Sequence, residues 1–403
     1  MKEDFRSVEF APGKVLSVET GRIAKQADGS VVVRMGDTMV LCTAVSAKEP
    51  KPGQDFFPLT VDHKESFSAA GRFPGGFMKR EGRSNEKEIL SSRLIDRVLR
   101  PLFPKGYVCD TQVISSVISS DDENDGDVLG GVGASLAIHL SDIPFDGPMA
   151  EVRVGRIDGN FVINPTVSEL KESDIDMTVG GTADSILMIE GEMKEISEKE
   201  MLEAIKAAHE AIQKLCAFQE ELRQELGKPK RVFVPPAVDT DLENKVKDLA
   251  ESQIKDIVNI GLGKEEYNEK ISEVKAAVVA KFEETEATDD ELKEVKKILG
   301  SIEKNALRNM ILEQERRIDG RTPVDIRDIW TQVGYIARAH GSAIFTRGET
   351  QALVSATLGT KRDEQSVDTL FDQEAKSFYL HYNFPPYSVG EAGFMRGPGR
   401  REI

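Results

Sequence analysis

The residues best suited to chemistry lie in a basic, glycine-rich loop over residues 71–83. Between Arg72 and Lys105 the sequence holds nine Lys/Arg and four acids, a local charge of +5 in a chain whose net charge is −17. The loop combines an aromatic ring and cations with four glycines. Rings stack on bases and cations neutralise phosphates, so this combination is typical of a grip on single-stranded nucleic acid. A solvated surface loop is the alternative that the residues alone leave open.

Three arginines follow on a helix expected over residues 91–99, spaced so that they share one face: Arg93, Arg97 and Arg100. They either face an anionic ligand or pair with nearby acids, namely Glu86, Glu88 and Asp96. Guanidinium groups suit the first role because they stay charged and present several donors. The spacing leaves both interpretations open, most evenly for Arg100.

Two related units must position these residues, because the chain repeats itself. The series Gly29-Ser30 and Gly36-Asp37-Thr38 recurs 312 residues later as Gly341-Ser342 and Gly348-Glu349-Thr350. In each copy apolar runs flank the second glycine, which predicts a β-hairpin. Further along, GGFMKRE (75–81) parallels GPGRRE (397–402). Two homologous units are therefore expected.

A different pattern separates the two units. Residues 197–226 carry the apolar stripe of a long helix, which a Ser197–Glu200 capping box opens and Gly227 ends. Residues 230–236 are interpreted as a linker. From 239 to 300 only helical periodicity is present, with 17 acids and 10 bases. We therefore predict an α+β fold with a first core over 1–230, an all-helical domain over 231–310 and the start of a second core over 311–403.

The composition excludes several other classes of protein. No stretch approaches the roughly 18 apolar residues of a membrane span, and the first residues lack the apolar core of a secretion signal. Three cysteines lie far apart and favour neither a disulfide framework nor a metal site: Cys42, Cys109 and Cys216. A reducing cytoplasm fits this usage.

Four stretches of the sequence resemble bacterial polynucleotide phosphorylases. They are GGFMKREGRSNEKEILSSRLIDRVLRPLFPKGY, SSDDENDGDVLGGVGASLAI, IPFDGPMAEVRVGRIDGNFVINPT and HYNFPPYSVGEAGFMRGPGRREI. The likeness covers essentially the whole chain. It implies duplicated RNase PH-like cores (ribosomal protein fold-like β/α domains) joined by a small all-α domain, with the second core truncated at Ile403. In that family a KH domain and an OB-fold domain follow the second core.

The resemblance also implies an activity, that of a polyribonucleotide nucleotidyltransferase in mRNA turnover. Such an enzyme is a homotrimeric ring that degrades single-stranded RNA from its 3′ end and releases nucleoside diphosphates. Inorganic phosphate is the implied co-substrate and Mg²⁺ (or Mn²⁺) the implied cofactor, with metal ligands beyond Ile403 and none within this chain. RNA-degradosome components are implied partners, and a membrane is not.

The resemblance assigns roles to ten residues. The Phe-Phe-Arg-Arg motif of the family's channel constriction falls on Phe77, Met78, Lys79 and Arg80, so one ring per subunit is kept and Lys79 lacks the guanidinium fork. The expected RNA-binding residues are Phe77, Met78, Lys79, Arg80, Arg83, Arg93, Arg97 and Arg100. Arg400 and Arg401 match an arginine pair that holds phosphate and RNA at the active site, and are the expected catalytic residues.

An acidic segment predicts that the first core is silent. Residues 119–127 (SSDDENDGD) stand where the second core would carry phosphate-binding serines ahead of a helix. A helix N-terminus attracts anions, but Asp125 and Asp127 would fill it with their own charge and repel phosphate. The spacing is not that of a calcium loop.

We expect a part of a longer chain that is inactive alone, because most of the catalytic site would lie beyond Ile403. Two other functions stay open. One is a catalytically silent ring that threads RNA or serves as a scaffold. The other is a subunit of a hydrolytic, exosome-like ring.

Overall fold

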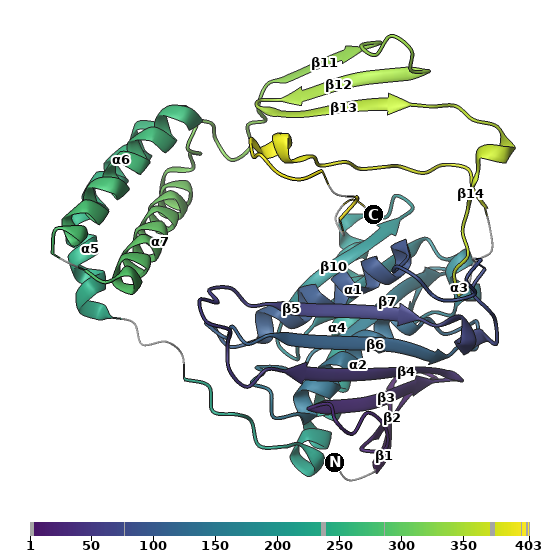
Figure 1. Ribbon diagram of the computed structural model, residues 1–403. Coiled ribbons are helices and arrows are strands. Elements are labelled where there is room, and N and C mark those ends of the chain that lie inside the picture. The colour runs from purple at the N-terminus through teal and green to yellow at the C-terminus, as the bar shows by residue number, and fades with distance from the viewer. Residues whose placement is uncertain are drawn as a thin grey trace. The chain divides into compact units, whose positions relative to one another are not determined.

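The chain forms two compact units, Met1–Pro235 with Lys361–Ile403, and Pro236–Thr360. The computed structural model describes residues 4–75, 77–234, 239–285, 287–370, 375–395, 397–399 and 402. Figure 1 labels the elements of both units in chain order. None of the helices among these residues is both long and apolar enough to cross a membrane.

Two sheets organise the first unit. The larger has the strand order β1-β2-β3-β4-β6-β5 and is antiparallel except for the parallel pair β5–β6. Its strands are β1 (Asp4–Ala11), β2 (Lys14–Thr20), β3 (Gly29–Met35), β4 (Thr38–Ser46), β5 (Leu59–Glu65) and β6 (Thr111–Ser119). The smaller, antiparallel sheet has the order β10-β9-β7-β8. Its strands are β7 (Ala150–Ile157), β8 (Asn160–Ile163), β9 (Ile175–Gly181) and β10 (Ile186–Met193).

Helix α2 is the centre of this unit. The helices are α1 (Glu86–Leu99), α2 (Gly126–Leu140), α3 (Val167–Glu172) and α4 (Glu198–Leu226), with short 3₁₀ turns at Phe67–Ala70 and Arg100–Leu102. All residues of α2 are buried, and it packs against β3, β4 and β6 of the larger sheet and β7 of the smaller one (Figure 1). Small residues permit this approach, since a Cβ added to Gly133 would lie 2.5 Å from the Cys42 sulfur.

Capping residues set the helix boundaries. The Ser197–Glu200 capping box opens α4 and Gly227 follows its last residue, as the sequence predicts. Helix α1 begins five residues before the expected Ser91, because Asn85 and Glu88 form a further capping box. Because α1 begins with polar residues, apolar periodicity in the sequence did not indicate that the helix extends this far.

The stretch expected as a linker starts as part of the first unit. The Lys230 ammonium donates to the Ile138 carbonyl at 2.9 Å, at the C-terminal end of α2. The Arg231 guanidinium pairs with Asp142 at 2.8 Å, and the Phe233 ring lies 5.4 Å from that of Tyr107. Lys230 thus ties this stretch to the C-terminal end of α2, and Arg231 and Phe233 hold it to other parts of the first unit.

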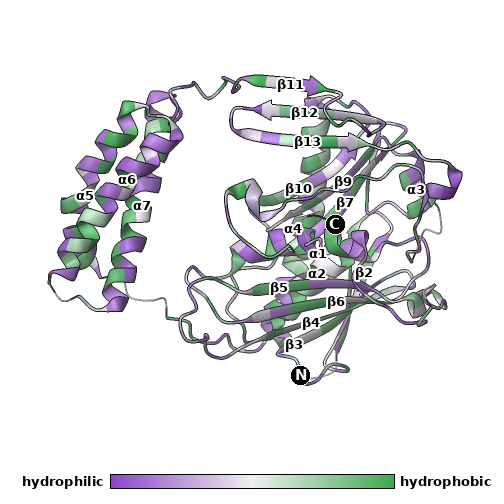
Figure 2. Ribbon diagram, turned by 45° about the horizontal axis from the view of Figure 1, so that its top comes forward, coloured by the Kyte–Doolittle hydropathy of each residue, from purple (hydrophilic) through white to green (hydrophobic). Residues whose placement is uncertain are grey.

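The second unit combines a helical bundle with a small sheet. Its helices are α5 (Thr240–Ile260), α6 (Lys264–Glu283) and α7 (Asp289–Gln314), which share a hydrophobic core of their own. Hydrophilic and hydrophobic residues alternate around all three (Figure 2), as the sequence periodicity predicts. The antiparallel strands β11 (Ile329–Val333), β12 (Gly341–Arg347) and β13 (Thr350–Ala356) form the sheet. Beyond it, the short elements η3 (Lys361–Asp363), β14 (Gln365–Ser366), β15 (Ala375–Lys376) and η4 (Pro386–Val389) belong to the first unit.

The sequence repeat is also a structural repeat. Strands β3 and β4 pair Gly29 with Ala44, and β12 and β13 pair Gly341 with Ala356, so the register is the same at an offset of 312 residues. The turn glycines Gly36 and Gly348 adopt φ values of 61° and 59°, a conformation that favours glycine. The expected duplicated α+β architecture with an intervening helical region is therefore confirmed.

The two copies differ in burial. Val40, Cys42 and Ala44 of β4 have no exposed surface, whereas the equivalent residues of β13 are exposed, with 49% for Val354. Helix α2 covers β3 and β4 so closely that a Cβ on Gly29 would lie 1.8 Å from the Ala137 carbonyl oxygen. At Gly341 the nearest atom would be the Ala356 Cβ, at 3.5 Å.

This contrast generates a matched prediction. The substitution Gly29→Ala should destabilise the first unit by about 1–3 kcal/mol, because the new methyl group forces α2 away from β3. The equivalent Gly341→Ala should change stability by less than about 0.5 kcal/mol. Native-state hydrogen exchange of the β3–β4 and β12–β13 amides measures both. Equal loss of protection in the two variants would contradict the account.

Candidate nucleic-acid interface

The loop over residues 71–83 presents its aromatic and cationic side chains to solvent. Phe77 is 99% exposed and Met78 80%, and Lys79, Arg80 and Arg83 are exposed as well. Exposed rings beside cations are the arrangement that base stacking and phosphate neutralisation require. The structure therefore places the five predicted loop residues where a nucleic acid could reach them.

Sequence reasoning missed a second ring on the same loop. Phe73 is 83% exposed and lies four residues before Phe77. Its signal in the sequence was an aromatic residue among glycines and cations, the same signal that singled out Phe77. The chain therefore offers two exposed rings here, although Met78 stands where the family has an aromatic residue.

One guanidinium fixes the base of the loop to a distant segment. Arg72 pairs with Asp368 at 2.8 Å and donates to the carbonyls of Thr369 and Leu370 at 2.9 and 3.2 Å. Leu370 is itself buried in the hydrophobic core of the first unit. The loop passes so near that a Cβ on Gly75 would lie 2.5 Å from an Asp368 carboxylate oxygen. A segment from the second sequence repeat thus holds the loop of the first.

The three arginines of the α1 stretch differ in their surroundings. Arg100 pairs with Asp96 at 2.6 Å and donates to the Leu59 carbonyl at 3.1 Å, contacts that support a structural role. Arg97 pairs with Glu190 of β10. Arg93 is exposed and makes no ion pair with any residue that the structure describes. The predicted RNA contacts of these arginines stay predictions.

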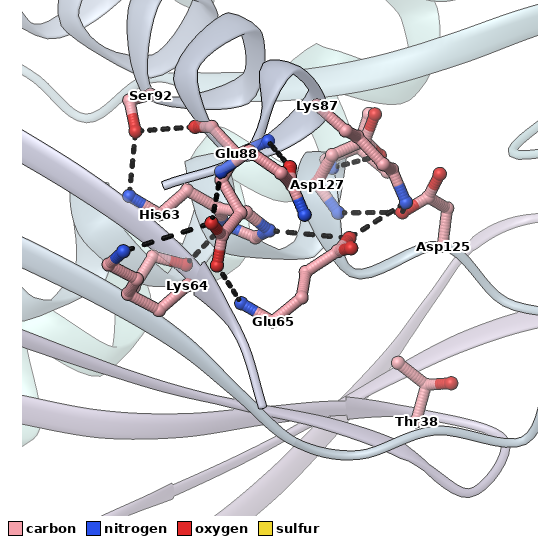
Figure 3. A network of polar contacts seen from close by, with 12 residues as sticks. Thr38, His63, Lys64, Glu65, Lys87, Glu88, Ser92, Asp125 and Asp127 are labelled. Atoms are coloured by element: carbon pink, nitrogen blue, oxygen red, sulfur yellow. Dashed lines mark hydrogen bonds and ion pairs between the residues drawn. The ribbon is translucent and has the colours of Figure 1, made fainter. Parts of the chain in front are cut away.

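The N-terminus of α2 carries a closed network of charges (Figure 3). Asp125 caps the helix, and its carboxylate accepts from the Asp127 amide. The Lys87 ammonium lies 3.0 Å from Asp125 and 2.7 Å from Glu65. Arg153 pairs with Asp127 at 2.5 Å. Two carboxylates therefore occupy the end of the helix where an anion would bind, and Lys87 and Arg153 pair with them.

The titration of these groups reflects the pairing. Burial alone would raise the pKa of Asp125, but Lys87 and Arg153 hold it below its ordinary value. Burial lowers the pKa of Lys87, but Asp125 and Glu65 more than compensate and raise it. Burial raises the pKa of Asp127 more than Arg153 lowers it. Opposite charges close together thus favour the ionised forms of Asp125 and Lys87, whereas burial disfavours the ionised form of Asp127.

Asp121, in the same acidic segment, has a structural role. Its carboxylate accepts from the Asp37 amide at 2.9 Å and the Asn124 amide at 2.7 Å, and from the Thr38 hydroxyl at 3.0 Å. These bonds hold its pKa below the ordinary value, against the effect of burial. Asp121 therefore ties the β3–β4 turn to the segment before α2. Within the described part of the chain no three His, Cys, Asp or Glu residues form a group that could hold a metal ion.

The predicted catalytic residues Arg400 and Arg401 lie outside the described residues. Next to them, the Glu402 carboxylate accepts from the Phe384 and Gly399 amides, both at 2.8 Å. These bonds lower the pKa of Glu402 and join the chain on either side of the η4 turn.

Three family models match the chain. That of the 3′ exoribonuclease family, domain 1, matches residues 13–144 and 325–403, and that of domain 2 of the same family matches residues 147–211. Between them, residues 241–322 match the model of the polyribonucleotide nucleotidyltransferase RNA binding domain.

Curated relatives match over nearly the full sequence. A polyribonucleotide nucleotidyltransferase of Chlorobium chlorochromatii (strain CaD3) is 56% identical over 99% of this chain and 57% of its own length. That of Chlorobaculum parvum (strain DSM 263 / NCIMB 8327) is 55% identical over 99% and 56%. The chain thus spans a little over half the length of these relatives. A solved chain titled "archaeoglobus fulgidus exosome with RNA bound to the active site" aligns over 52% of this chain and 87% of that one, at 17% identity. Its TM-score of 0.42 is too low to define the fold.

The closed network at α2 generates a prediction. Replacing Asp125 and Asp127 by Ser removes the carboxylates at the helix N-terminus and leaves Lys87 and Arg153 with only Glu65 and Asp176 as partners. The variant should lose about 3 kcal/mol of stability and gain affinity for inorganic phosphate, which the unchanged chain should lack. Thermal unfolding in phosphate against chloride at matched ionic strength measures the gain. A triple variant that adds Lys87→Met is the control and should respond less. Equal responses of all three proteins would contradict the account.

Proposed function

The chain belongs to the 3′ exoribonuclease family, and on this premise we propose that it forms part of a polyribonucleotide nucleotidyltransferase. The proposed reaction shortens single-stranded RNA from its 3′ end with inorganic phosphate and releases nucleoside diphosphates. The observation that carries the proposal is the exposed loop, in which Phe77 and Met78 stand beside Lys79, Arg80 and Arg83. The relatives and the three matching family models support it.

The loop would grip RNA without reading its sequence. Stacking on an aromatic ring contributes about 1–3 kcal/mol per base and tolerates every base. Lys79 and Arg80 add attraction to phosphates, which salt weakens. In the proposed homotrimer each subunit would bring one copy of the loop to a common channel. The trimer, the cytoplasmic location and degradosome partners stay predictions from the resemblance.

We assign the chemistry to the second core and a silent role to the first. The α2 N-terminus of the first core is filled by Asp125 and Asp127, which Lys87 and Arg153 neutralise, so it offers no place to inorganic phosphate. Arg400 and Arg401 stay the proposed ligands of phosphate and RNA. Phosphoryl transfer is promoted by positioning and charge neutralisation, a task that suits arginine.

The described acids do not fit the implied Mg²⁺ (or Mn²⁺). A divalent cation needs several carboxylate, carbonyl or water oxygens around one point. The candidate carboxylates of the first core instead pair with cations or accept backbone amides. The implied metal and its ligands stay predictions from the resemblance.

Release of ADP from oligo(A) tests the proposed reaction. The full-length protein should release ADP only when phosphate is present, and the 403-residue chain should bind oligo(A) without cleaving it. Release of AMP without phosphate would instead support a hydrolytic ring, and RNA binding without release by the full-length protein would support a scaffold. Robust ADP release by the 403-residue chain would overturn the assignment of the catalytic residues.

Affinity for oligo(A) tests the loop in the same preparations. The double variant Phe77→Ala/Met78→Ala should bind about tenfold more weakly, since stacking on Phe77 is lost. The variant Phe56→Ala is the matched control, because Phe56 is 64% exposed in the same unit but lies outside the loop. Unchanged affinity of the double variant across a salt series would remove the stacking claim.

A further inference from the structure

Each of the two repeated loops carries a glutamate directly after its pair of cations. The sequence reads KRE at 79–81 and RRE at 400–402, at an offset of 321 residues. A carboxylate beside cations is unfavourable where the ligand is a polyanion, because like charges repel. The presence of Glu81 and Glu402 at equivalent positions therefore needs a physical reason other than attraction of the ligand.

Glu81 closes the loop of the first repeat. Its carboxylate accepts from the Phe67 amide at 3.0 Å, and Phe67 is the first residue of the 3₁₀ turn η1 (Phe67–Ala70). The Arg72 amide donates to the Phe67 carbonyl at 2.9 Å, and the Arg72 guanidinium lies 5.4 Å from the centre of the Phe67 ring. Both ends of the segment 72–81 are therefore fastened to one residue, as in a compact surface loop whose ends lie close together.

Glu402 makes the corresponding contact in the second repeat. Its carboxylate accepts from the Phe384 amide at 2.8 Å, and it also accepts from the Gly399 amide at 2.8 Å. The Glu402 amide donates in turn to the Gly399 carbonyl at 2.9 Å. The residues on either side of Arg400 and Arg401 are thus hydrogen-bonded to each other, and Glu402 connects them to Phe384.

The turns to which the two glutamates are fastened are alike. Turn η1 ends at Gly71 and turn η4 at Gly390, with φ values of 65° and 73°. Each of these glycine amides donates to the carbonyls of the first two residues of its turn. Because these bonds already close each turn, the carboxylate is not needed for the turn itself. Its bond instead connects the turn to the residues that follow the basic pair.

Neither carboxylate serves to neutralise a described cation. Glu81 and Glu402 form no ion pair with the residues that the structure describes, and neither do Lys79 and Arg80. Backbone amides lower the pKa of Glu402 below its ordinary value, so this side chain is ionised at neutral pH. Hydrogen bonds from amides to a carboxylate are stronger than those between neutral groups. Such a contact fixes the chain and leaves neighbouring cations available to another anion.

We propose that Glu81 and Glu402 are positioning residues, whose carboxylates fasten the end of each loop and so hold the preceding cations toward RNA or phosphate. This inference rests on the proposed function, which assigns RNA contacts to the pair 79–80 and the ligands of phosphate to the pair 400–401. Neither glutamate touches the ligand. Their effect on binding passes through the cations that precede them.

Binding of labelled oligo(A) to the 403-residue chain tests the first repeat. The variant Glu81→Ala should bind about threefold more weakly, because a charge-assisted hydrogen bond that fixes the loop is lost. The variant Glu81→Gln should lie between the two, since its amide oxygen can still accept from the Phe67 amide. The matched control is Glu49→Ala, because Glu49 is exposed in the same unit and forms no hydrogen bond or ion pair with the described residues. Tighter binding of both Glu81 variants would show that the carboxylate only repels RNA, and would overturn the proposal.

A double-mutant cycle separates positioning from a general effect on the fold. In a Lys79→Gln/Arg80→Gln background, Glu81→Ala should change the affinity by less than about 1.5-fold, because the cations through which it acts are gone. An equal loss in both backgrounds would assign Glu81 to the fold alone and overturn the proposal.

The same cycle distinguishes this proposal from the proposed function. If Lys79→Gln/Arg80→Gln binds oligo(A) as tightly as the unchanged chain, the loop does not grip RNA, and the proposed function of the loop fails together with the role of Glu81. If that variant binds more weakly while Glu81→Ala does not, the proposed function stands and the positioning role is overturned.

Steady-state release of ADP by the full-length protein tests the second repeat. The variant Glu402→Ala should raise the KM for inorganic phosphate about threefold or more, because the arginine pair loses its fixed position. The variant Glu402→Gln should restore part of this loss, and Glu49→Ala should leave the KM unchanged. A lower kcat with an unchanged KM for phosphate in both Glu402 variants would overturn the positioning role.

Discussion

The position of the basic loop depends on the guanidinium of Arg72. A glycine-rich loop with exposed rings cannot hold itself in place, because apolar side chains in water gain nothing from any one position. Arg72 constrains the loop through Asp368 and two carbonyls of the following residues, and Leu370 carries that segment into the hydrophobic core. The interaction joins residues 296 positions apart, so the loop of the first repeat is positioned by a segment of the second.

A second set of internal charge pairs lies at the N-terminus of α2 in the first unit. A helix N-terminus can bind a free anion or an internal carboxylate, and α2 has the internal one. Lys87 and Arg153 then neutralise the carboxylates instead of an external phosphate. The first repeat is in this way closed and buried around α2, whereas β12 and β13 of the second expose the equivalent face. The two copies of one fold thus differ in how far the same face is covered.

Local patterns in the sequence predicted much of this fold, and long-range pairing was beyond them. The glycine spacing predicted the two equivalent hairpins, and the Ser197–Glu200 box predicted the start of α4, because turns and caps are set by neighbouring residues. The pairing of Arg100 with Asp96 was one of two open interpretations, since both residues lie on one helix. Asp368 as the partner of Arg72, and Arg153 as that of Asp127, could not be predicted, because no periodicity links residues on separate elements.

The most direct test of the central claim is whether Asp368 supports RNA binding through Arg72. Electrostatics alone predicts that Asp368→Asn strengthens oligo(A) binding, since a negative charge near the loop is removed. An anchoring role of the Arg72–Asp368 ion pair predicts the opposite sign, a loss of about 2–5-fold, because the loop loses an ion pair worth about 0.5–1 kcal/mol. In an Arg72→Gln background the same substitution should have no effect. Tighter binding of Asp368→Asn, or an equal effect in both backgrounds, would contradict the account.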